Sequence, residues 1–170
     1  INVYSSVVLT QGTQNDSGFI GGQYSGPHGC TLMTWNGTSW HNTDKALISG
    51  RYYANGSGTT NAGLVTGGAE SASPYPGSTC TEEWNGTTWA TAGALGRAQK
   101  DGSAGGTQNA TTYYSGYPNA YTEEYNGTAW STGPNGPNAT TQAGGSGGAG
   151  NMMQSPGLAG TAGIHIFETS

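Results

Sequence analysis

Charge is the scarcest property of this chain. Only 8% of its 170 residues are charged, and the net charge is −5. The cations are Lys45, Arg51, Arg97 and Lys100. So few basic residues form no patch for a nucleic acid or an anionic membrane surface, and we expect neither partner. No apolar run approaches the roughly 20 residues of a membrane-spanning helix, which argues against membrane insertion.

Groups that bind metals or perform catalysis are also few. The three histidines, His28, His41 and His165, lie in unrelated places, and no two of them have the spacing of metal ligands. We therefore expect no metal site and no cofactor.

Two pairs of neighbouring carboxylates, Glu82-Glu83 and Glu123-Glu124, invite an acid and base interpretation. Both pairs occupy the same place in a repeat, which favours structural use. One carboxylate of each pair would face solvent, and the other would face a neighbouring sheet, near Arg51 or Arg97. We expect no catalytic residues and no enzyme.

The chain is rich in glycine and aromatic residues, with 32 glycines, 5 tryptophans and 10 tyrosines, and many of them recur in a sequence repeat. The hexapeptide at 35–40 (WNGTSW) recurs at 84–89 (WNGTTW) and at 125–130 (YNGTAW). A second motif, ending at Asn15, is echoed at Asn61, Asn109 and Asn151, at spacings of 46, 48 and 42 residues. Four repeats fit these spacings.

Each repeat reads as four strands. Asn-Gly between two aromatic-bearing segments is a strong hairpin signal, and it predicts a type I′ turn with positive φ at both residues. Short apolar strands ending in glycine precede each hairpin, and further strands, such as 3–10 and 97–105, precede those. We predict one all-β domain, 1–170, a four-repeat β-propeller-like structure with antiparallel blades at about 1–44, 45–94, 95–134 and 135–170. The fourth blade lacks its last strand.

The order of these features resembles kelch-like repeats of the galactose-oxidase type. Arg51 and Arg97 would lead first strands, Gly67-Gly68 would end a second strand, and Trp84 and Trp89 would flank the turn. The combined motifs look like repetitive propeller segments in phage tail-fibre-like and environmental bacterial surface proteins. The four repeats would be a compact ring or an arc of a larger one.

The resemblance implies a non-enzymatic structural and adhesive module of an extracellular or virion appendage, such as a tail fibre or surface filament. The alternative is a soluble carbohydrate-binding lectin that uses loop aromatics. Cell-surface glycans are the expected ligands in both cases, because aromatic rings stack on sugars while hydroxyl and amide groups bind their hydroxyls. The candidate glycan contacts outside the hairpin motif are Tyr52, Tyr53, Tyr75, Tyr113, Tyr114 and Tyr117.

Two kinds of covalent modification are open. Cys30 and Cys80 would form a disulfide between the first two blades, stay as buried free thiols, or bond between molecules. Seven Asn-x-Ser/Thr sequons are candidates for N-glycosylation: Asn15, Asn36, Asn55, Asn85, Asn109, Asn126 and Asn138.

The incomplete fourth blade predicts assembly. Its third strand, ending at 167–170, would have an open edge. Residues beyond Ser170, a strand from a neighbouring subunit, or the segment 1–10 could cover that edge. We favour pairing between subunits, into a homo-oligomer or filament assembled through β-edge contacts.

Overall fold

The computed structural model describes residues 7–9, 18–21, 31–70, 76–116, 119–135, 144–148, 151–155 and 165–168. These residues form strands, turns and connecting segments, with no helix among them. All strand pairs are antiparallel, and the predicted all-β class is therefore confirmed. Across the same residues there is accordingly no helix long and apolar enough to span a bilayer.

The strands form four sheets in the order of the chain. The first sheet contains β1 (Val7–Leu9), β2 (Gly18–Gly21), β3 (Thr31–Trp35) and β4 (Trp40–Ala46). The second contains β5 (Asn55–Thr59), β6 (Ala62–Thr66), β7 (Thr81–Trp84) and β8 (Trp89–Thr91). The third contains β9 (Ser103–Thr107), β10 (Ala110–Gly116), β11 (Asn119–Tyr125) and β12 (Trp130–Thr132). The fourth contains β13 (Gly144–Gly148), β14 (Asn151–Ser155) and β15 (His165–Glu168).

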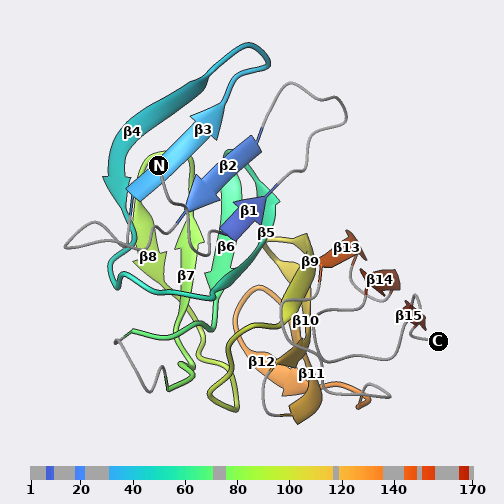
Figure 1. Ribbon diagram of the computed structural model, residues 1–170. Coiled ribbons are helices and arrows are strands. Elements are labelled where there is room, and N and C mark those ends of the chain that lie inside the picture. The colour runs from blue at the N-terminus through green and yellow to red at the C-terminus, as the bar shows by residue number, and fades with distance from the viewer. Residues whose placement is uncertain are drawn as a thin grey trace.

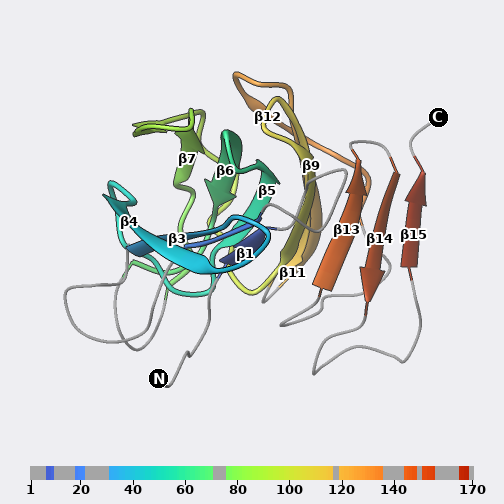
Figure 2. The same ribbon diagram turned by 90° about the horizontal axis from the view of Figure 1, so that it is seen from above.

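Each sheet is a meander in which strands that follow one another in the chain are paired (Figure 1). The first strands of the sheets contact one another in series, β1 with β5, β5 with β9, and β9 with β13. Figure 2 shows the sheets fanned out in chain order, with the first and fourth at opposite ends of the fan. The described sheets thus form an open fan around their innermost strands.

The Asn-Gly hairpins join the two outer strands of the first three sheets, as predicted. In the first hairpin, Trp35 pairs with Trp40 across a four-residue loop. The predicted type I′ turn is wrong, because only the glycine, Gly37, takes a positive φ (90°). Asn36 instead caps the loop with its side chain, whose Oδ1 accepts the backbone N–H groups of Thr38 and Ser39. The hairpins of the second and third sheets repeat this arrangement.

The arginines do not lead strands. Arg51 lies before β5, and Arg97 lies six residues before β9 begins at Ser103. The segment around Arg97 contributes only an isolated bridge, between Gln99 and Ser78. The predicted strand over 97–105 is therefore wrong in its first half, which connects two sheets.

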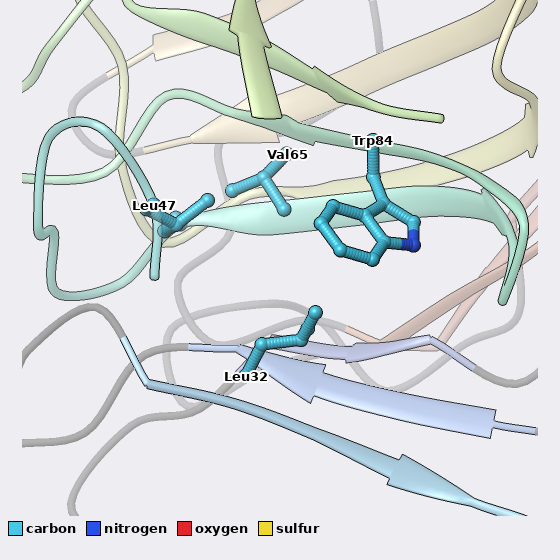
Figure 3. Close-up of a cluster of buried hydrophobic side chains, with 5 residues drawn as sticks. Leu32, Leu47, Val65 and Trp84 are labelled. Atoms are coloured by element: carbon cyan, nitrogen blue, oxygen red, sulfur yellow. The ribbon is translucent and has the colours of Figure 1, made fainter. Parts of the chain in front are cut away.

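The core lies between neighbouring sheets. Leu32 on β3 points toward the second sheet and meets Val65 and Trp84, with Leu47 from the connecting segment beside them (Figure 3). A second cluster, Leu95, Ala104 and Tyr113, with Trp130 packed against it, lies where the third sheet meets the second. The aromatic residues of the repeated hairpin motif thus pack neighbouring sheets against each other.

Candidate functional site

Glu82 is a structural residue. It lies on β7, is fully buried, and its carboxylate accepts the backbone N–H groups of Ile48 (2.7 Å) and Ser49 (3.1 Å). The Arg51 guanidinium completes the set with an ion pair at 3.1 Å. These contacts fix the segment that enters the second sheet, and we call them the carboxylate clamp.

Glu123 on β11 forms a second clamp with the same geometry. It accepts the backbone N–H groups of Gly96 (2.6 Å) and Arg97 (3.2 Å) and the side-chain amide of Gln99 (3.2 Å). Each donor lies 48 residues after its counterpart in the first clamp, so Gln99, and not Arg97, matches Arg51. The Arg97 side chain stacks on Tyr121 instead, 3.8 Å from the ring centroid. The prediction that a glutamate lies near Arg51 is confirmed, and the matching of Arg97 with Arg51 is wrong.

The neighbouring glutamate has a different role in the sheet contact. Glu83 faces the third sheet and accepts a hydrogen bond from the Tyr125 hydroxyl at 2.8 Å. Burial, and then the Glu83 carboxylate, raise the pKa of Tyr125 to about 12. Glu82 and Glu83 therefore point to opposite faces of the sheet, as strand geometry requires. The prediction that one of them faces solvent is wrong, because a neighbouring sheet lies against the Glu83 side as well.

This hydrogen bond predicts a loss of stability at alkaline pH. Because the pKa of Tyr125 is about 12 in the folded chain and about 10 in an unfolded one, its contribution is full below pH 10 and declines toward pH 12. Urea unfolding across this range should therefore show a smaller alkaline loss for Tyr125→Phe than for the wild type. Some loss should persist, because burial also raises the pKa values of Tyr113 and Tyr114. An unchanged pH profile would contradict this role of Tyr125.

The structure corrects part of the predicted glycan site. Tyr113 and Tyr114 are 0% and 2% exposed, so neither ring can stack on a sugar. They alternate across β10, where Tyr113 packs in the cluster between the second and third sheets, and β10 also contacts β13 of the fourth sheet. A run of two tyrosines does not reveal these neighbours. Tyr52 and Tyr53 are half-buried, with the Lys100 ammonium 6.0 Å from the Tyr53 ring centroid. Tyr75 and Tyr117 lie outside the described residues.

The predicted modification sites stay predictions. Cys80 is a half-buried free thiol whose pKa is raised by desolvation, and its predicted partner Cys30 lies outside the described residues. Among the sequon asparagines, Asn55 is half-buried, whereas Asn36, Asn85, Asn109 and Asn126 are exposed. Asn15 and Asn138 are not among the described residues.

The first sheet has a partly exposed apolar face. Since Leu32 points toward the second sheet, strand alternation places Met33 and Trp35 on the opposite side. Met33 and Trp40 are 37% and 41% exposed, and the rings of Trp35 and Trp40 are paired, with centroids 5.5 Å apart. We call Met33, Trp35 and Trp40 the leading face.

The matching residues of the later sheets are covered by the preceding sheet. Trp84 and Tyr125 match Trp35, and each is only 4% exposed. Trp89 and Trp130 match Trp40, and both pack against buried clusters. The leading face therefore has the composition of a contact between sheets, but no described sheet covers it.

Among the residues whose structure is described, no group of three or more His, Cys, Asp or Glu side chains could hold a metal ion. Comparison with protein-family models finds no match, and no curated protein matches the sequence.

Proposed function

We propose that this chain is a non-enzymatic structural and adhesive module of an extracellular or virion appendage. The leading face is the observation that carries the proposal. The exposed Trp40 and Met33, with the half-buried Trp35 paired to Trp40, form an apolar surface of the kind that marks contacts between proteins. The buried clamps support the non-enzymatic part, because Glu82 and Glu123 are fully used in holding connecting segments.

In this proposal the four sheets are blades of a β-propeller-like domain whose fourth blade has three strands. A second copy brings a sheet against the leading face, and the contact repeats those between consecutive sheets of one chain. Pairing at an open strand edge, the other mode that the sequence predicts, would use β15 as the outer strand of the fourth sheet.

The oligomeric state tests this proposal. Sedimentation of the wild-type chain at increasing concentration should show association, because the exposed leading face becomes buried between copies. Substituting both Met33 and Trp40 by serine should shift the equilibrium to the monomer by at least about tenfold in dissociation constant, as expected for an aromatic residue central to an interface.

Ile48→Ser is the matched control, since Ile48 is 61% exposed but lies outside the leading face. It should leave association unchanged. A wild-type chain that stays monomeric at high concentration would refute assembly altogether. Undiminished association of the double variant would instead place the contact at a strand edge.

A soluble lectin is the second candidate function. It is favoured by a groove between the first two sheets, whose lining combines hydroxyl and amide groups with one lysine.

A further inference from the structure

A groove of about 560 Å³ lies between the first and second sheets. Its lining includes Thr34, Trp35 and Thr43 from the first sheet, Thr60, Asn61 and Trp84 from the second, and Lys45 at the end of β4. This volume lies within the range of small-molecule sites, about 300–1,000 Å³.

The second and third sheets meet in the same way, but side chains bridge their contact. Gln108, at the turn between β9 and β10, donates to the carbonyls of Gly63 (3.0 Å) and Trp84 (2.8 Å). The Tyr125 hydroxyl reaches Glu83 from the third sheet to the second. These hydrogen bonds connect the second and third sheets at the place that corresponds to the groove between the first and second sheets.

The first contact lacks every one of these bridging side chains. By strand register, Thr60 takes the place of Gln108, and it is too short to reach across. Trp84 replaces Tyr125 and donates its indole N–H to Thr60 O within its own sheet, at 2.9 Å. Thr34 replaces Glu83, so no carboxylate is present to accept a bond.

A backbone difference opens the groove further. Gly93, after β8, lies so close to the carbonyl oxygen of Thr128 that a Cβ atom there would overlap it. The hairpin of the third sheet can therefore press directly against the second sheet. The residue matching Gly93 in the first sheet is Asp44, whose side chain does not permit this approach.

The lining defines the chemistry of a ligand. Threonine hydroxyls and asparagine amides offer hydrogen bonds to sugar hydroxyls, whereas Trp84, which is 4% exposed, is too buried to stack on a sugar ring. The lining contains one cation, Lys45, and no carboxylate. The other cations are engaged elsewhere, with Arg51 paired to Glu82, Arg97 stacked on Tyr121 and Lys100 near Tyr53.

We propose that this groove binds a short oligosaccharide that carries a carboxylate, as uronic and sialic acids do. Lys45 pairs with the carboxylate, and the threonine and asparagine side chains bind the hydroxyls of the neighbouring sugars. The site deepens the adhesive part of the proposed function, but it does not depend on assembly through the leading face.

The test is an array of acidic and neutral glycans probed with the wild-type chain and three variants. The wild type should bind carboxylate-bearing saccharides, and added salt should weaken the binding. Lys45→Met should weaken binding to acidic saccharides about tenfold, because a charge-assisted hydrogen bond is lost. Thr60→Gln should abolish binding, because glutamine at that position would bridge to the carbonyls of Gly18 and Trp35, as Gln108 does one sheet later.

Thr107→Gln is the control for Thr60→Gln, since Thr107 is exposed and lies away from the groove. It should bind as the wild type does. The proposal is overturned if no acidic saccharide binds, if Lys45→Met leaves their binding unchanged, or if Thr60→Gln still binds while its circular dichroism is native. Glycan binding that persists in the monomeric variant with serine at Met33 and Trp40 would separate this site from assembly.

Discussion

Replacing Glu82 by alanine should lower the free energy of unfolding by about 3–5 kcal/mol, the range found when one partner of a buried ion pair is removed. The variant leaves three donors without their acceptor, namely the backbone N–H groups of Ile48 and Ser49 and the guanidinium of Arg51. Urea unfolding monitored by tryptophan fluorescence measures the change.

The other half of the ion pair should matter far less. Arg51→Gln reproduces the second clamp, in which the Gln99 amide donates to Glu123. It should lower the free energy of unfolding by about 1 kcal/mol or less. Two guanidinium nitrogens of Arg51, Nε and Nη1, are buried without an acceptor among the described residues, so removing them relieves a desolvation cost. Equal losses for the two substitutions would show that the ion pair, and not the backbone N–H groups, stabilises this region.

Replacing Trp84 by alanine should also destabilise the fold by about 3–5 kcal/mol, because a large buried side chain leaves a cavity. Trp84 is 4% exposed, packs on Leu32 across the contact between sheets, and donates its indole N–H to Thr60 O. Thermal and urea unfolding at low protein concentration would measure the effect.

Trp40→Ala is the matched control, since it removes a tryptophan from the same hairpin motif at a place that none of the described sheets covers. Trp40 is 41% exposed, and the substitution should cost about 1 kcal/mol or less. Similar losses at the two positions would mean that the contact between the first and second sheets contributes little stability.

The repeat made the strands and hairpins predictable, because Asn-Gly and flanking aromatics carry strong local signals. The turn type was not predictable, because loop length decides it, and the four residues between Trp35 and Trp40 leave Asn36 to cap the loop. The sequence pattern also matched Arg97 with Arg51, although Gln99 occupies that position. The shift of two residues between the repeats becomes apparent only from the groups that donate hydrogen bonds to Glu123.

The candidate surfaces were less predictable than the strands. The burial of Tyr113 depends on a neighbouring sheet, which a single segment of sequence does not encode. The groove arises from differences between repeats, such as Thr60 against Gln108 and Asp44 against Gly93. These differences can be read from an alignment of the repeats. Their effect on the groove can be predicted only when it is known which residues face each other across the contact between sheets.

The serial arrangement of the sheets has a consequence for cooperativity. Because β5 contacts β1 and β9, while β9 contacts β5 and β13, the stability of the fan is a sum of terms for single sheets and for adjacent pairs. The second and third sheets each gain two such coupling terms, and the first and fourth gain one each within the fan. Opening fluctuations should therefore start at the first and fourth sheets, and amide hydrogen exchange should be slowest in β6 and β10. A partner docked on the leading face would add the missing coupling term to the first sheet and slow exchange there.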